Sequence, residues 1–293
     1  MIGDSDAVAQ SGTNGATRMN FTSLDRLLPA RPRMLIVTGA GCSTGSGIPD
    51  YRDREGEWKR AAPVHLPEFM AKAEARTRYW ARSMAGWRAF SLAAPNAAHD
   101  ELARWEAQAW CHHLITQNVD GLHQRAGQRR VVDLHGRLDT VVCLDCGHRS
   151  RRADLQERLL AANPDWTYEI DRIAPDGDVD LRRVDYDAFT VLPCARCGGM
   201  LKPDVVFYGE NVPRTRVEFC LARLDEADAL VVVGSSLMVF SGFRFARHAY
   251  TANKPVLVIN RGRTRADDLA ALKLDADASE ALPQLRGWLE ARR

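Results

Sequence analysis

Five short apolar segments constrain the fold of this 293-residue chain more than any other feature of its sequence. Each is four or five residues long, most are rich in β-branched residues, and each meets a Gly, Asn, Asp or Ser at its C-terminal end. They span residues 34–38, 114–117, 131–134, 230–233 and 256–259. Such segments are typical of parallel strands that are buried on both faces.

Helical patterns lie between these segments, at residues 75–93, 98–107, 215–225 and 241–251. Strands that alternate with helices predict an α/β fold with a doubly wound, Rossmann-like parallel sheet. Ligands of such sheets bind at the carboxyl ends of the strands. The residues that follow the apolar segments are therefore the first candidates for a functional site.

The alternation stops between residues 141 and 200, which carry a helical pattern at 153–162 and a polar region at 174–180. We interpret this stretch as a small module inserted into a larger domain, which is made of residues 25–140 and 201–293. The first 20 residues contain no apolar core, and we expect residues 1–24 to form a disordered tail.

A glycine-rich turn follows the first apolar segment. It reads Gly39-Ala40-Gly41, and backbone N–H groups in such a turn can approach a pyrophosphate. The dinucleotide fingerprint of dehydrogenases would require a third glycine where Thr44 stands, and an acidic residue at the end of the next strand, which is missing. The turn therefore predicts nucleotide binding without hydride transfer; a tight turn that binds nothing is the alternative.

Polar residues follow the other predicted strands as well. Residues 48–53 (IPDYRD) could cover a nucleotide or form a surface loop, and residues 116–123 (TQNVDGLH) suit ribose and carboxamide contacts or an Asx turn. His135 ends a strand, where a histidine can act as a general base or be structural. The turns at 234–236 (GSS) and 260–262 (NRG) suit an adenosine ribose and its phosphate.

Four of the seven cysteines form two CxxC pairs, Cys143 with Cys146 and Cys194 with Cys197. Four thiolates at this spacing predict one structural zinc ion with a closed, tetrahedral ligand set. The 47 residues between the pairs (147–193) exceed the usual spacing, and a thiol redox pair is the alternative. That alternative is disfavoured because neither pair opens a helix beside the main sheet. Cys42, Cys111 and Cys220 are expected to be free thiols.

The composition argues against several classes of protein. No apolar run is long enough for a membrane span, the start of the chain does not resemble a secretory signal, and the net charge is only +2 with dispersed arginines. We therefore expect no membrane or direct nucleic-acid partner. An odd number of cysteines without a secretory signal favours the reducing cytoplasm.

These motifs together resemble the sirtuin family of NAD-dependent protein deacylases. The matching segments follow the family order over about residues 30–285, and they are GAGCSTGSGIPDYRD (39–53), TQNVDGLH (116–123), LHG (134–136), the paired CxxC motifs, KPDVVFYGE (202–210), GSS (234–236) and IN (259–260). The resemblance implies an enzyme that transfers the acyl group of an acylated lysine in a protein to ADP-ribose, with release of nicotinamide. NAD is then a consumed co-substrate.

The resemblance also implies a role for individual residues. The catalytic residues would be His135, as general base toward a ribose hydroxyl, with Asn118 and Asp120. NAD would be bound by Gly39, Ala40, Gly41, Ser43, Asp50, Tyr51, Arg52, Gln117, Asn118, Val119, Asp120, Gly234, Ser235, Ser236, Asn260, Arg261, Gly262 and Ala278. The substrate would be bound by Tyr79, Arg82, Val205, Val206, Phe207, Tyr208, Gly209 and Glu210, with the peptide added as a strand.

The finer match is to the class II branch, which includes a mitochondrial paralogue that removes lipoyl and other large acyl groups. Residues 175–179, 241–245 and 264–269 and the long insertion between the cysteine pairs resemble that branch. Tyr79 and Arg82 resemble the Tyr-x-x-Arg with which the desuccinylating branch binds an acyl carboxylate, and the two share a helix face. Helix packing with a solvated Arg82 is the alternative.

Two further activities stay open at this point. A mono-ADP-ribosyltransferase would use the same bound NAD with another acceptor. A zinc-stabilised NAD-binding module would bind NAD without turning it over. The presence of Asn118, Asp120 and His135 argues against the module. We expect a cytoplasmic monomer, and the sequence leaves the acyl group and the protein targets open.

Overall fold

The computed structural model describes residues 19, 21–59, 63–174 and 176–292, and its main feature is a six-stranded parallel sheet. The strand order is β11-β10-β9-β1-β2-β3, and all five neighbouring pairs are parallel. The strands are β1 (Met34–Thr38), β2 (Cys111–Thr116), β3 (Val131–Asp133), β9 (Ala229–Val233), β10 (Val256–Ile259) and β11 (Leu272–Leu274). This order confirms the predicted doubly wound α/β class.

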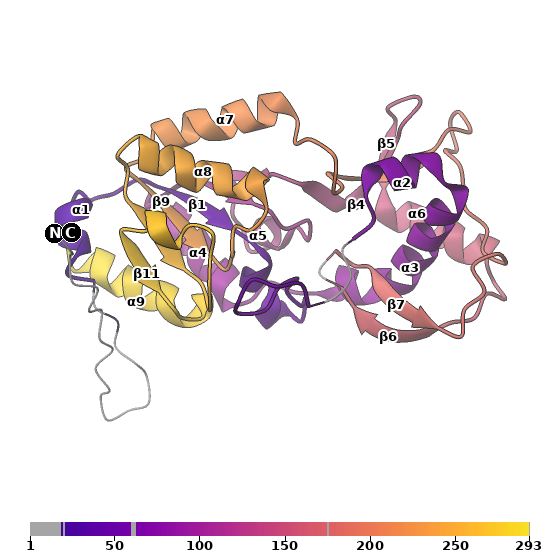
Figure 1. The fold of residues 1–293 in the computed structure, drawn as a ribbon, viewed down its shortest axis with the longest axis horizontal. Helices are drawn as coiled ribbons and strands as arrows, with labels where there is room; N and C mark the ends of the chain where they lie inside the picture. Colours follow the sequence, from indigo (N-terminus) through magenta and orange to yellow (C-terminus); the bar gives the residue numbers. More distant parts are fainter. Residues whose placement is uncertain (1–18, 20, 60–62, 175, 293) are drawn as a thin grey trace.

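Helices cover both faces of this sheet, as Figure 1 shows. They are α4 (Ala97–Ala107) and α9 (Ala278–Glu290) on one face and α7 (Arg214–Asp225) and α8 (Phe240–Thr251) on the other. Successive side chains of a strand point to opposite faces, so Met34 and Ile36 of β1 pack with the first pair of helices and Leu35 and Val37 with the second. Burial on both faces explains the continuous apolar segments of the sequence.

A smaller group of elements lies at the other end of the molecule (Figure 1). It combines a three-stranded antiparallel sheet, β5-β4-β8, with a two-stranded hairpin, β6-β7, and three helices. The elements are α2 (Leu66–Ala71), α3 (Ala73–Leu92), β4 (Gly136–Cys143), β5 (Arg149–Arg151), α6 (Arg152–Ala162), β6 (Glu169–Ile173), β7 (Val179–Arg182) and β8 (Leu201–Val205).

The core of this smaller part differs in one respect from the predicted module of residues 141–200. Trp80 and Met84 of α3 are buried against Leu155 and Leu159 of α6. The small part therefore draws on two separate stretches of the chain, because neither stretch alone buries both of these apolar helix faces.

The short elements that remain connect these layers. They are α1 (Leu24–Leu27), α5 (Leu122–Arg125) and the single 3-10 turns η1 (Ala40–Cys42), η2 (Thr44–Ser46) and η3 (Asp267–Leu269). Within the residues that the structure describes, no helix has both the length and the hydropathy to cross a bilayer.

The N-terminal segment differs from the predicted tail of residues 1–24. Residues 1–18 and 20 of that tail lie outside the described residues. Phe21 and Leu24 are buried in the main core, and the ring of Phe21 lies 6.3 Å from that of Trp288 in α9. The ring of Phe21 packs beside the end of α9 and Leu24 lies in the main core, so this part of the predicted tail belongs to the folded chain.

Candidate active site

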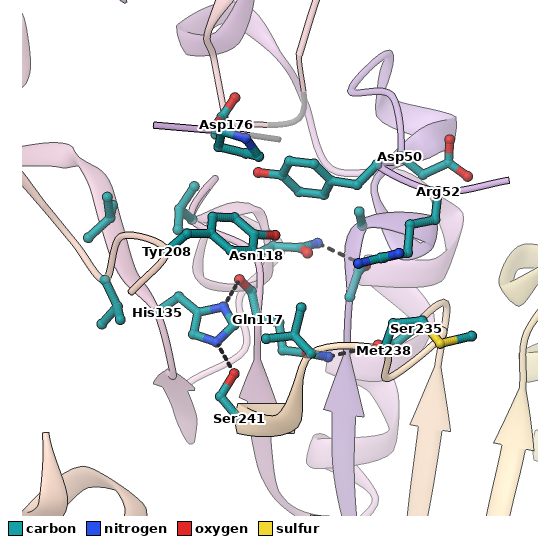
Figure 2. Close-up of a pocket in the computed structure, with 18 of the residues that line it drawn as sticks. Asp50, Arg52, Gln117, Asn118, His135, Asp176, Tyr208, Ser235, Met238 and Ser241 are labelled. Carbon is teal, nitrogen blue, oxygen red and sulfur yellow. Dashed lines mark hydrogen bonds between the residues drawn. The ribbon is translucent and has the colours of Figure 1, made fainter. Parts of the chain in front are cut away.

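A cavity of about 410 Å³ lies where the main sheet meets the smaller part. The ends of β1, β2 and β9 supply one wall, through residues such as Gly39, Asn118 and Ser235. The smaller part supplies the other, through residues such as Tyr79 and Asp178. The cavity thus lies at the carboxyl ends of the strands, as expected for this fold, and Figure 2 shows its interior.

The glycine turn after β1 is in direct backbone contact with the end of β9. The N–H of Gly41 donates to the carbonyl oxygen of Gly234 at 2.9 Å. A Cβ atom on Gly41 would lie 2.9 Å from that oxygen, and one on Gly234, whose φ is +58°, would overlap the backbone nitrogen of Cys42. Glycine is therefore required at both positions, and the cavity wall here is bare backbone, which suits a phosphate group.

A hydrogen-bond network links the turn after β2 to the glycine turn. The amide nitrogen of Asn118 donates to the carbonyl oxygen of Gly39 at 3.0 Å and to Ser43 Oγ at 2.9 Å. Ser43 Oγ donates to Asp120 Oδ2 at 2.7 Å. Nearby, Gln117 Nε2 donates to Ser235 Oγ at 2.8 Å. Side chains from three strand ends are thus held in fixed orientations along one wall.

Arg52 brings a positive charge to the same wall. Its guanidinium lies 4.1 Å from the ring centroid of Trp58 and donates to the carbonyl oxygen of Gly56 at 2.7 Å. Asp50 and Tyr51 line the cavity beside it. A cation held next to a wall of bare glycine backbone suits a pyrophosphate, so the residues present fit a dinucleotide.

His135 lies at the end of β3 between two polar partners (Figure 2). Nδ1 is 2.9 Å from the carbonyl oxygen of Gln117, and Nε2 is 2.8 Å from Ser241 Oγ. Burial lowers the pKa of His135 to about 4, and the nearby charges of Arg216 and Arg244 act in the same direction, against the bond to Gln117. The ring is therefore neutral at pH 7 and can accept a proton.

The predicted substrate segment lies across the cavity from the glycine turn. Val205, Val206, Phe207, Tyr208, Gly209 and Glu210 all line it. The N–H of Val206 donates to the carbonyl oxygen of His135 at 2.7 Å, and Lys202 Nζ is 2.9 Å from Glu210 Oε2. β8 is the last strand of its three-stranded sheet, a position from which a peptide strand can be added.

The position of Arg82 differs from the one predicted for it in the substrate site. It is not among the cavity-lining residues, whereas Tyr79, Asp176 and Asp178 are. Its guanidinium donates to Asp178 Oδ1 at 2.8 Å, to Asp180 Oδ1 at 2.9 Å and to the carbonyl oxygen of Val179 at 2.6 Å. Its charge is already paired, so the structure offers no support for a bond from Arg82 to an acyl carboxylate.

Two predicted cofactor residues also lie away from the cavity lining. Gly262, with φ +80°, donates from its N–H to Asp275 Oδ1, and Ala278 is buried in the first turn of α9. The other predicted cofactor residues all line the cavity; these are Gly39, Ala40, Gly41, Ser43, Asp50, Tyr51, Arg52, Gln117, Asn118, Val119, Asp120, Gly234, Ser235, Ser236, Asn260 and Arg261. The adenosine contacts of Gly262 and Ala278 stay predictions.

The structure adds lining residues to which the sequence assigned no role. Asp176 and Asp178 enter from the loop between β6 and β7, and Ser241 and Arg244 from the N-terminal half of α8. Residues 175–179 and 241–245 stand out in the sequence as segments typical of one branch, but nothing local in them indicates which side chains face a cavity.

The four paired cysteines come together outside this cavity. Their sulfur atoms all lie within 4.8 Å of one another, with Cys143 3.5 Å from Cys197 and Cys146 4.0 Å from Cys194. A tetrahedral zinc ion with bonds of about 2.3 Å would place its sulfur ligands roughly 3.8 Å apart. The cluster therefore fits one structural zinc ion, as predicted.

Comparison with known proteins identifies relatives over most of the chain. The family model described as "Sir2 family" matches residues 39–241. An NAD-dependent protein deacetylase of Bradyrhizobium diazoefficiens is 53% identical over 260 residues, which are 89% of this chain and 95% of the relative. The mitochondrial NAD-dependent protein lipoamidase sirtuin-4 of Bos taurus is 48% identical over 263 residues, 89% of this chain and 84% of the relative.

Solved structures show the same relationship. One described as Sir2 with a p53 peptide and NAD+ has a TM-score of 0.70 and 27% identity, and the match covers 88% of this chain and 94% of that one. Sequence and structure comparisons therefore agree on one family over most of the chain.

Proposed function

The chain belongs to the Sir2 family, and from this premise we propose that it is an NAD-dependent protein lysine deacylase. It would transfer the acyl group of lysine to ADP-ribose and release nicotinamide. The observation that carries the proposal is the neutral, half-buried ring of His135 in the cavity that the glycine turn also lines. A base and a dinucleotide cradle in one cavity are what this reaction requires.

In this proposal NAD, when bound, supplies an activated glycosidic bond whose leaving group is nicotinamide. The turn of Gly39 to Gly41 and the charge of Arg52 would hold the pyrophosphate. Asn118, Ser43 and Asp120 would orient the nicotinamide ribose, since their mutual bonds fix the three side chains before any ligand enters. His135 Nε2 would take up the proton of a substrate hydroxyl.

The peptide would bind along β8, with its acyl-lysine directed toward His135. Backbone bonds to residues 205–210 would supply affinity with little dependence on the peptide's sequence. Tyr79 and Phe207, whose rings are in contact with centroids 5.3 Å apart, would together form one apolar wall beside the acyl chain.

We further propose that the preferred acyl groups are uncharged, and that the chain belongs to the class II, lipoamidase-like branch. The 48% identity to a lipoamidase supports the branch. Two observations support uncharged acyl groups. Asp176 and Asp178 line the cavity wall, and the guanidinium of Arg82 is already paired with Asp178, so an acyl carboxylate at this wall would meet acidic side chains in place of that cation.

Acyl-lysine peptides carrying acetyl, lipoyl or succinyl groups, incubated with NAD and the purified protein, test these proposals by mass spectrometry. The expected result is NAD-dependent loss of acetyl or lipoyl with little loss of succinyl. Gain of an ADP-ribosyl unit without acyl loss would identify a transferase instead. His135→Ala should abolish turnover, and His248→Ala should not, because His248 pairs with Asp225 outside the active-site cavity.

A further inference from the structure

Ser241 stands in direct contact with the one ring nitrogen of His135 that can act as a base. Its Oγ atom is 2.8 Å from Nε2, while Nδ1 of the same ring is 2.9 Å from the carbonyl oxygen of Gln117. A carbonyl oxygen can only accept a hydrogen bond, so Nδ1 carries the ring proton in the neutral imidazole. The lone pair is then on Nε2, and Ser241 donates its hydroxyl proton to it.

The position of Ser241 is determined by close backbone packing. It is the second residue of α8, and the next residue, Gly242, is buried. A Cβ atom at Gly242 would overlap the side-chain amide of Gln117. The absence of a side chain at this position lets the first turn of α8 approach the end of β2, and that approach brings the hydroxyl of Ser241 within reach of His135.

This contact has a consequence for any proton that His135 receives. A general base must be within hydrogen-bond reach of the proton that it takes up, directly or through one intervening group. The described structure fills that place at Nε2 with Ser241, which lines the same cavity as Gln117, Asn118 and His135. A hydroxyl group can donate one proton while it accepts another.

We propose that Ser241 is a proton relay, and the proposal rests on the deacylase function proposed above. A substrate hydroxyl gives its proton to Ser241 Oγ as Ser241 passes its own proton to His135 Nε2. The O–H bond of the substrate and that of Ser241 break, while a new O–H bond at Ser241 and an N–H bond at Nε2 form. Serine is regenerated, His135 becomes the imidazolium, and the Nδ1 proton stays on the bond to Gln117.

Histidine-selective ¹⁵N NMR of the protein without substrates tests the contact apart from activity. The His135 signal is assigned by its loss in His135→Gln. In the unmodified protein the Nδ1–H form should be seen, and Ser241→Val should raise the pKa of His135 by on the order of half to one pH unit, because the donated bond stabilises the neutral ring. Ser241→Thr keeps the hydroxyl group and should leave that pKa in place.

The kinetic test compares Ser241→Thr with Ser241→Val, which have the same shape and differ in the hydroxyl group. Acyl transfer should fall by about 10- to 100-fold in Ser241→Val, with KM for NAD unchanged, and Thr should restore most of the rate. Exchange of labelled nicotinamide into NAD precedes the proton transfer and should persist in both variants. Ser91→Ala, an exposed serine on α3, is the surface control.

Single-turnover acyl transfer in mixtures of H₂O and D₂O distinguishes a relay from direct transfer. If two protons move in the same step, the rate of acyl transfer in the unmodified protein depends on the deuterium content along a curve. If only one proton moves, that dependence is a straight line. An unchanged or faster acyl transfer in Ser241→Val would overturn the relay and make Ser241 a restraint on His135. Equal loss of exchange and acyl transfer in that variant would also overturn it. No deacylation by the unmodified protein would instead refute the proposed function.

Discussion

Replacing Arg82 by alanine separates two roles for this side chain. In the structure it ties α3 to the β6–β7 hairpin through two ion pairs, with Asp178 at 2.8 Å and Asp180 at 2.9 Å. The Tyr-x-x-Arg pattern predicts instead that Arg82 binds the carboxylate of an acidic acyl group. The first role predicts a loss of stability and a similar effect on every acyl substrate, whereas the second predicts a loss confined to succinyl-lysine.

The size of the stability loss follows from the burial of the partners. Asp180 is 42% exposed, so the ion pair between Arg82 and Asp180 contributes little to the stability of the fold. Asp178 is 18% exposed, and burial, followed by the charge of Asp176, raises its pKa to about 7. Leaving this group without its cation should cost about 1–3 kcal/mol. For a chain of this size that corresponds to a fall in the melting temperature of roughly 3–10 °C.

The sign of the pH dependence follows from the same group. Arg82 lowers the pKa of Asp178, so Arg82→Ala should raise it further above its unfolded value. A carboxyl group whose pKa is higher in the folded state than in the unfolded state stabilises the fold at pH values below its unfolded-state pKa. That stabilisation is lost as the pH rises through its folded-state pKa. The deficit of Arg82→Ala should therefore be larger at pH 8 than at pH 6, and adding Asp178→Asn should remove most of it.

Thermal unfolding at both pH values and kcat/KM for acetyl- and succinyl-lysine peptides are the assays. Arg78→Ala is the matched control, since Arg78 lies on the same helix in a long, exposed contact of 3.9 Å with Glu68. An Arg82→Ala protein with unchanged melting temperature and a selective loss of succinyl removal would refute the reasoning and restore the carboxylate role.

Three other predictions follow from the site. Chelation of zinc, or Cys146→Ser, should release one zinc ion per chain and lower the melting temperature, measured by metal analysis and calorimetry, because the small part folds around the cluster. Gly234→Ala should abolish NAD binding in titration calorimetry without unfolding the chain, because its Cβ would overlap Cys42 and displace the glycine turn; unchanged affinity would contradict this. Because the pKa of His135 in the folded state is about 4, kcat/KM should show no fall on the acid side near pH 6.5. The contribution of the His135 ring to folding stability should be lost as the pH falls from 6.5 toward 4, and a comparison with His135→Gln measures that loss.

The main sheet could be predicted because its signals are local. β1, β9 and β10 are buried along their whole length, so the apolar run in the sequence marks the strand itself. The predicted segments 34–38 and 256–259 match β1 and β10 residue for residue. β11 was not predicted. It has three residues at the edge of the sheet, one of them only partly buried, and so short a segment has no recognisable period.

The smaller part was harder to predict because its contacts join distant stretches of chain. β4 pairs with β8, about 60 residues later, and α3 packs on α6 and β7. The pairing of Arg82 with Asp178 joins residues 96 positions apart, and that of His135 with Ser241 joins residues 106 apart. Motifs could place His135 and Asn118 in the site, but the partners that determine their chemistry arise from tertiary packing.

Thr44, which stands where the dehydrogenase fingerprint has its third glycine, has a structural explanation. That glycine allows a long helix to pack against the strand immediately after the turn. Here no long helix follows: the chain makes two single turns, η1 and η2, and Gly47 ends the second with φ +81°. Thr44 starts η2, and its hydroxyl donates to the carbonyl oxygen of Gly41 at 3.1 Å.

The chain after η2 leaves the sheet and helps to close the cavity. Ile48 is buried with Leu122, Leu138 and Phe90, so the segment packs against residues that lead into the smaller part as well as against α5. Asp50, Tyr51 and Arg52 follow and line the cavity. The same departure from the fingerprint that argues against hydride transfer thus frees a length of chain to line the cavity. In the proposed reaction, covering the nucleotide in this way would limit attack by water on the ribose carbon that nicotinamide leaves.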